Sequence, residues 1–142
     1  MRLLIIIFLA LFNLNVIGQE NTFIRTYNLP GMNGGLALAV MEDGGFVGTG
    51  QHNDNGTCRT YVYRIDECGN IIWFNLYGGY GGGMAIDDTY DNGVVIAAYP
   101  GTIFKLDVLG DPQWYKTYSS VSDYMTSVIQ TSDSGYFAGG QY

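Results

Sequence analysis

The fold is decided by the stretch from Ile71 to Gly110, which reads IIWFNLYGGYGGGMAIDDTYDNGVVIAAYPGTIFKLDVLG. Its landmarks recur before and after it: Trp73 and Trp114 are 41 residues apart, and so are Asp66 and Asp107. A period near 40 residues is typical of arrays of small structural modules. The sequence therefore predicts a repeat protein built from similar units.

The complete unit contains four short runs with strand character, separated by glycine-rich or Asp-x-Gly turns. In the complete unit these runs cover about 72–77, 84–89, 94–99 and 103–107. After the N-terminal segment no stretch shows the apolar spacing of an amphipathic helix, so little helix is expected.

Four antiparallel strands in about 40 to 45 residues are the signature of a β-propeller blade. The sequence thus predicts an all-β, β-propeller-like fold. A solenoid or an open β-sandwich remains the alternative. The expected units are two full blades and part of a third, at about 23–69, 71–110 and 112–142.

Alignment on the turn aspartates Asp43, Asp91 and Asp133 supports the repeat. An aliphatic residue lies five positions before each aspartate, and a bulky apolar residue lies four positions after it. Such columns are expected when each sheet packs face to face against a neighbouring sheet. The two columns are Leu38, Ile86 and Val128, and Val47, Val95 and Phe137.

These repeats resemble those of exported β-propeller proteins of Gram-negative bacteria. The resemblance is carried by an aromatic-x-x-x-Tyr run, a Thr-x-Asp-x-Gly turn and a following glycine pair, here Trp114, Tyr118, Thr131, Asp133, Gly135, Gly139 and Gly140. It implies the propeller fold, export and often a C-terminal secretion-sorting domain. Because its motifs mark blades, it implies no particular activity.

Residues 1–18 read as a secretory signal peptide, with basic Arg2, ten apolar residues from Leu3 to Phe12, and small Gly18 before the cut. The apolar run is shorter than the roughly 20 residues that a membrane-spanning helix needs. We therefore expect a secreted or cell-surface protein, residues 19–142, with no membrane span after cleavage.

The remaining chain contains 5 basic and 13 acidic residues, a formal net charge of −8. Nucleic-acid binding depends on neutralising phosphates with Lys and Arg, so this charge argues against a nucleic-acid partner. A closed propeller needs about four to eight blades. The chain is accordingly interpreted as the N-terminal part of a longer protein whose C-terminal blades are its missing partners.

The turn aspartates favour a structural role. Thr89-x-Asp91-x-Gly93 and Thr131-x-Asp133-x-Gly135 are similar to the Asp-box of sialidase-type propellers, in which the carboxylate accepts backbone N–H groups and Gly supplies a positive φ. Strand parity places these aspartates at one end of the sheets. Such a ring of oxygens is also the kind of site that binds Ca²⁺; no other cofactor is expected.

The least regular feature is the additional length at residues 51–58 of the first unit. It contains the one histidine of the chain, so His52, Asp54 and Asn55 are candidate metal ligands, although a plain solvated loop is the favoured interpretation. A Cys58–Cys68 disulfide is disfavoured, because the strand expected between them spans roughly 20 Å, whereas a bridge needs Cα atoms within about 7 Å.

Tyr80, Tyr99 and Tyr124 fall outside the repeated aromatic columns. Aromatic rings outside the core can form a sugar-stacking surface, so these are candidate ligand-binding residues, beside the simpler interpretation that they only pack. The sequence contains no nucleophile elbow, no Cys-x-x-Cys and no His-Glu-x-x-His motif.

We therefore expect a non-enzymatic binding or scaffold module for a glycan or protein ligand, with no catalytic residues. The alternative is the N-terminal part of a propeller enzyme, such as a glycosidase or a quinone-dependent dehydrogenase, whose active site lies mostly in the missing blades.

Overall fold

A computed structural model describes residues 24–27, 32–78, 81–118 and 124–141. Within these ranges every regular element is a strand, as the sequence predicts, and no helix is long and apolar enough to cross a membrane. The predicted signal peptide, residues 1–18, lies outside the described residues and stays a prediction.

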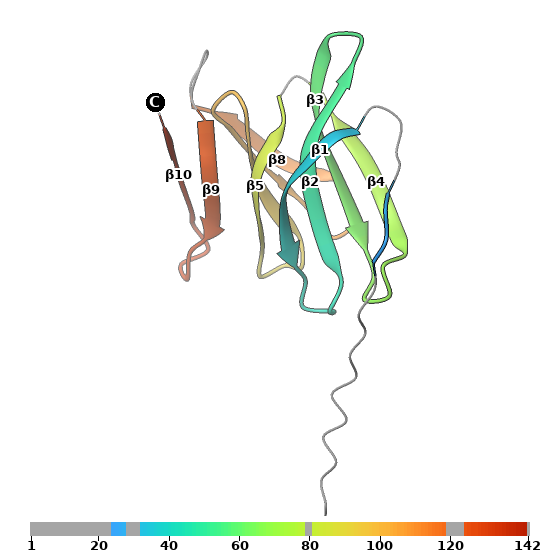
Figure 1. Ribbon diagram of the computed structural model, residues 1–142. Helices are drawn as coiled ribbons and strands as arrows, with labels where there is room; N and C mark the ends of the chain where they lie inside the picture. Colours follow the sequence, from blue (N-terminus) through green and yellow to red (C-terminus); the bar gives the residue numbers. More distant parts are fainter. Residues whose placement is uncertain (1–23, 28–31, 79–80, 119–123, 142) are drawn as a thin grey trace, which may run out of the picture.

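The strands form three antiparallel sheets in which consecutive strands are neighbours (Figure 1). Sheet A contains β1 to β4, sheet B contains β5 to β8, and sheet C contains β9 and β10. The strands are β1 (Met32–Val40), β2 (Phe46–Asp54), β3 (Thr57–Ile65), β4 (Ile71–Tyr77), β5 (Gly83–Asp88), β6 (Val94–Ala98), β7 (Thr102–Leu106), β8 (Pro112–Thr117), β9 (Tyr124–Gln130) and β10 (Tyr136–Gln141).

The sheets are offset by one strand from the units at 23–69, 71–110 and 112–142. The aromatic strand β4 is the last strand of sheet A, where Trp73 lies opposite Arg64 of β3, and it does not begin a new sheet. In the same way β8 closes sheet B. A sequence period gives the length of a repeat but not the strand at which each sheet begins. The first strand of a sheet follows only from knowing which connections are hairpin turns within a sheet and which connection joins two sheets.

The turn from Asp66 to Gly69 explains the offset. The Asp66 carboxylate accepts the backbone N–H groups of Cys68 and Asn70 at 2.9 and 2.7 Å, and Gly69 has φ +79°. This is a tight hairpin turn, and Asp107 with Gly110 repeats it. The connection between sheets A and B is instead the glycine-rich link at 78–82.

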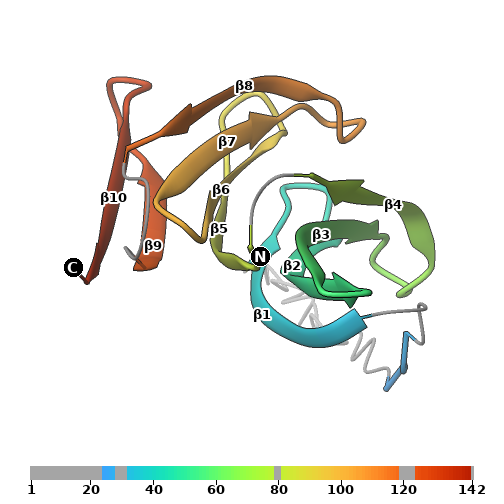
Figure 2. The same cartoon turned by 90° about the horizontal axis from the view of Figure 1, so that it is seen from above.

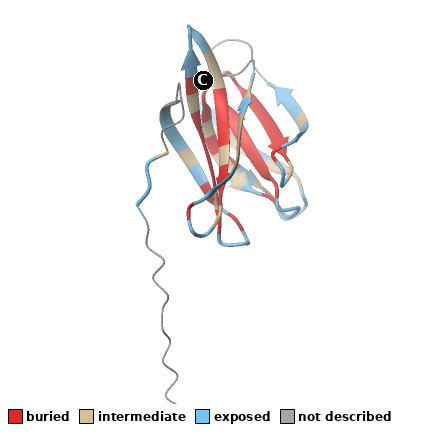
Figure 3. Cartoon of the chain, turned by 90° about the vertical axis from the view of Figure 1, so that its right-hand side faces the viewer, coloured by how far each residue is buried: buried red, intermediate tan, exposed pale blue. Residues whose placement is uncertain are grey.

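The sheets are stacked face to face, with β5 in contact with both β1 and β9 (Figure 2). Sheet B lies between the other two, so β6 and β7 are buried along their whole length. Figure 3 colours the buried residues red and the exposed residues pale blue. One core fills the space between sheets A and B and includes Val47, Val62, Ile96 and Phe104. The other lies between sheets B and C, around Val95 and Val128. Each such side chain contributes about 1.5 to 3 kcal/mol on burial.

The Asp-x-Gly turns have the hydrogen bonds that the sequence predicts, because the carboxylates of Asp43, Asp91 and Asp133 accept the N–H two residues on at 3.1, 3.3 and 3.0 Å. The glycine has a different role from the predicted one. The positive φ belongs to the residue before it, such as Asn92 at +59°. A Cβ on Gly93 would lie 2.2 Å from the Leu106 carbonyl oxygen, so glycine is needed there for close packing.

Buried cations fix these turns to the next hairpin. Lys105 is 1% exposed, and its Nζ lies 2.8 and 3.0 Å from the two carboxylate oxygens of Asp91. Arg64 occupies the same place in sheet A, 2.6 Å from Asp43. The partial burial of Asp91 raises its pKa, but hydrogen bonds from Lys105, Thr89 and the Gly93 backbone outweigh this and lower the pKa to about 2.

We predict that Asp91→Asn lowers the free energy of unfolding at pH 7 by about 2 kcal/mol, because it leaves the buried Lys105 ammonium without a counter-ion. Lys105→Met should change it by less than about 1 kcal/mol, because Asp91 is half exposed and keeps its other donors. Urea unfolding of the two variants measures both values. Equal losses would contradict the asymmetry.

The same pair predicts a pH dependence. The folded-state pKa of Asp91 is below its ordinary value of 3.8, so its stabilisation is complete above about pH 4 and disappears as the pH falls toward 2. The difference in unfolding free energy between wild type and Asp91→Asn should shrink over that interval. A difference that stays constant between pH 5 and pH 2 would contradict the assignment.

Candidate functional site

A groove of about 640 Å³ is lined by residues at the end of the sheets opposite the Asp-x-Gly turns. It is bounded by the tip of the β2–β3 hairpin, the glycine-rich link between sheets A and B, the β6–β7 turn and the start of β9. The lining residues that the structure describes are Gln51, Gly56, Thr57, Cys58, Gly81, Gly82, Met84, Tyr99, Pro100 and Tyr124.

The first wall is the additional length at 51–58. Residues 53–57 are exposed to solvent, as expected, but the segment is a regular hairpin and not an irregular loop. β2 and β3 continue pairing out to Asp54 and Thr57, and the hairpin projects beyond its neighbours (Figure 1). Asn55 and Gly56, at φ +50° and +82°, form its two-residue turn. An Asn-Gly pair with two positive φ angles is the preferred turn for a tight hairpin, because its twist matches that of the strands.

The opposite wall is held by hydrogen bonds of the glycine-rich link. The backbone N–H of Gly81 donates to the Tyr99 carbonyl, and that of Tyr99 donates to the Gly82 carbonyl at 3.1 Å. The Thr60 hydroxyl donates to the Gly81 carbonyl at 2.6 Å. A Cβ on Gly81 would lie 2.7 Å from the Tyr99 ring, so glycine lets this ring lie directly on the backbone.

Two of the three predicted ligand-binding tyrosines meet in this groove. The rings of Tyr99 and Tyr124 are 4.8 Å apart between centroids, with 30° between their planes. Tyr99 is half-buried and Tyr124 is 41% exposed, so aromatic surface remains open to solvent. The third, Tyr80, lies outside the described residues.

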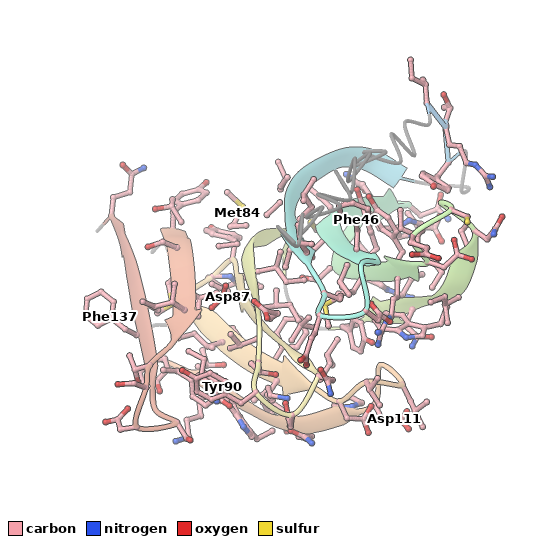
Figure 4. The ribbon with its side chains drawn as sticks, turned by 90° about the horizontal axis from the view of Figure 1, so that it is seen from below. Phe46, Met84, Asp87, Tyr90, Asp111 and Phe137 are labelled. Atoms are coloured by element: carbon pink, nitrogen blue, oxygen red, sulfur yellow. The ribbon has the colours of Figure 1, made fainter. Side chains whose placement is uncertain are left out.

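Met84 borders the groove at an irregularity that all three sheets share. The pairing of β5 with β6 skips a residue between Gly83 and Ala85, and β1 and β9 skip one at the equivalent place. Such bulges turn a side chain out of its regular direction and are frequent beside binding sites. Figure 4 shows Met84 on β5, close to sheet C.

The described lining of the groove carries no charged side chain. Its polar groups are the Gln51 amide, the Thr57 hydroxyl, the Cys58 thiol and the backbone of the link. Cys58 and Cys68 are both free, in keeping with the predicted separation, with Cys58 in β3 and Cys68 in the turn at its far end.

The candidate metal ligands His52, Asp54 and Asn55 differ in their surroundings. His52 is buried at 7% exposure, whereas Asp54 and Asn55 are exposed at the hairpin tip. In the part of the chain that the structure describes, no three His, Cys, Asp or Glu side chains are placed to hold a metal ion. The metal assignment, with Ca²⁺ as the ion, stays a prediction.

The carboxylates of the opposite end are engaged by their own turns. Hydrogen bonds from the Asn70 side chain and backbone and from the Cys68 backbone lower the pKa of Asp66. The Gly45 backbone N–H and Arg64 lower the pKa of Asp43 against the effect of partial burial. These shifts are what turn-forming carboxylates show.

A second groove, of about 570 Å³, lies beside β8 and is lined by Trp114, Lys116 and Tyr118 among others. In sheet A the equivalent aromatic residues, Trp73 and Tyr77, pack against sheet B. This second groove is therefore an outer part of a sheet-packing face, whereas the first lies among loops that depart from the repeat.

The sequence singled out the residues at 51–58 and the two tyrosines, but not that they face each other. It interpreted the glycine run as a flexible link and did not assign Gly81, Gly82 or Met84 to a site. One feature of the sequence could have indicated the groove: counting strands places residues 51–58 and Pro100 at the same end of the sheets.

Comparison with known proteins identifies no family. No protein-family model matches the chain, and no curated protein matches its sequence significantly.

We predict that Gly56→Ala lowers the free energy of unfolding by about 1 kcal/mol, because its φ of +82° is unfavourable for any residue with a Cβ. No atom lies within 4 Å of the added methyl group, so the effect is purely conformational. Gly78→Ala is the matched control, with equally open space and no positive φ, and should be close to neutral. Urea unfolding measures both, and equal effects would contradict the turn assignment.

Proposed function

We propose that this protein is an exported β-propeller-like binding module that holds a neutral glycan in the groove between the β2–β3 hairpin and the Tyr99–Tyr124 pair. The observation that carries the proposal is this pair of neighbouring rings in an uncharged groove. Pyranose rings have an apolar face that packs on an aromatic ring and a rim of hydroxyl groups that needs hydrogen-bonding partners.

The groove offers both kinds of contact. Its volume is in the range of about 300 to 1,000 Å³ typical of ligand sites, which combine apolar lining with a few polar groups. Gln51, Thr57 and backbone groups can exchange hydrogen bonds with hydroxyls. Because the described lining is uncharged, neutral sugars are favoured over sialic or uronic acids.

Binding is favoured over hydrolysis of the glycan. Glycoside hydrolysis uses two carboxylic acids across the scissile bond. Asp43, Asp66 and Asp91 lie in the turns at the other end of the sheets and are engaged by their own hydrogen bonds. A protein ligand is the second candidate in the same groove, and the test below separates the two.

The propeller-like arrangement is supported by the stacking of consecutive sheets with their first strands together. The export of the protein is supported by the pattern of residues 1–18 and by the acidic composition. Both remain part of the proposal.

We predict that a glycan array probed with the purified protein yields neutral saccharides, and that Tyr99→Ala and Tyr124→Ala each weaken the best hit by about 10-fold, as measured by titration calorimetry. Loss of one stacking ring costs about 1.5 kcal/mol, which corresponds to that factor. Tyr90→Ala is the control, because Tyr90 is 68% exposed in the turn at the opposite end. Binding unaffected by both groove variants, or capture of protein ligands alone, would overturn the glycan proposal.

A further inference from the structure

Two apolar faces of the described chain have no neighbouring sheet. On β1, Leu38 and Val40 are 64% and 58% exposed. On sheet C, Ile129 and Phe137 lie opposite each other and are 49% and 64% exposed. Figure 4 shows Phe137 pointing away from the rest of the molecule on β10. Contiguous exposed apolar surface of this kind marks an interaction site.

These two faces are the two halves of an interface that the chain already makes twice. Val47 of sheet A packs in one core with Ile86 of sheet B, and Val95 of sheet B packs in the next with Val128 of sheet C. By its place in the repeat, Phe137 continues the series of Val47 and Val95. Leu38 begins the series of Ile86 and Val128. A Phe137 face therefore has the Leu38 face as its structural complement.

Part of this face of sheet A is already covered by residues of the same chain. Across the sheet, Leu38 pairs with Gly48 and Gly48 with Tyr63, so these residues share one face. The outer half is already covered, because the ring of Tyr27 lies 5.8 Å from that of Tyr63 and its hydroxyl donates to the Gly69 carbonyl at 2.7 Å. The part of this face at Leu38 and Val40 of β1 remains exposed.

The contact made by Tyr27 repeats one between sheets. Tyr77, on the outer strand of sheet A, donates to the Gly110 carbonyl of sheet B at 2.6 Å. Residues 24–27 thus stand against sheet A as the outer strand β4 stands against sheet B. Leu38 and Val40 on the inner strand β1 stay exposed beside this contact.

We propose that sheet C of one copy of this chain docks on the open face of sheet A in a second copy, with Phe137 packed against Leu38. The two faces differ, so the contact is heterologous and each copy keeps one free face at either end. Such a contact adds copies until a ring closes or a filament grows.

Sedimentation velocity over a concentration series tests the proposal with the full chain and its Leu38→Asp and Phe137→Asp variants. The average mass of the wild type should rise with concentration to at least about twice that of either variant, which should stay monomeric because each lacks one half of the contact. An equimolar mixture of the two variants should form a 1:1 complex that grows no further, since one intact face of each kind remains.

The control is Leu109→Asp, at a position 68% exposed in the β7–β8 turn, which should associate like the wild type. Unchanged urea unfolding curves of all variants show that the sheets remain folded. A monomeric wild type at every concentration would overturn the proposal. Association of either single variant alone would also overturn it, because it would show that like faces pair. Failure of the two mixed variants to combine would overturn it as well.

Discussion

The constraint on which this structure depends is that a four-stranded sheet of short strands has two apolar faces and cannot cover either by itself. Sheet B shows the solution, because β6 and β7 are buried throughout only by virtue of a sheet on each side. The repeat in the sequence follows from this requirement, since each sheet must present the complement of what its neighbour presents. The 41-residue spacings preserve that complementarity.

Polar groups fix the stacked sheets in one register. The buried Lys105 and Arg64 each bind the aspartate of an Asp-x-Gly turn, and Arg64 also donates to the Val108 carbonyl of the next sheet at 3.1 Å. Trp73 and Tyr77 donate to carbonyls of that same turn region. Each apolar interface therefore ends in directional bonds at its rim, which oppose sliding of one sheet over another. Burying the charge of Lys105 costs desolvation energy, and the pairing of this charge with the Asp91 carboxylate offsets that cost.

The sequence predicted the strands, the turns and the face-to-face columns because all three have local or periodic signals. Asp43, Asp91 and Asp133 recur at equivalent places in the repeat, and the strand expected between Cys58 and Cys68 is part of β3. The sequence did not show at which strand each sheet begins, because Trp73 recurs with the same period whether its strand is the first of one sheet or the last of another. The roles of Lys105 and Gly93 depend on a long-range contact that no local pattern reveals.

The candidate site differs from the scaffold for the same physical reason. Residues that pack between sheets recur in every repeat. The β2–β3 hairpin, the glycine link and Tyr99 differ from one repeat to the next, because they lie beyond the stacked faces and are free of that constraint. Tyr99 lies in the β6–β7 turn of sheet B and Tyr124 begins β9 of sheet C, so the packing of these two sheets brings the two rings together. The stacking that buries Val95 against Val128 thereby also positions the two rings, and a rigid core supports a groove whose lining is open to change.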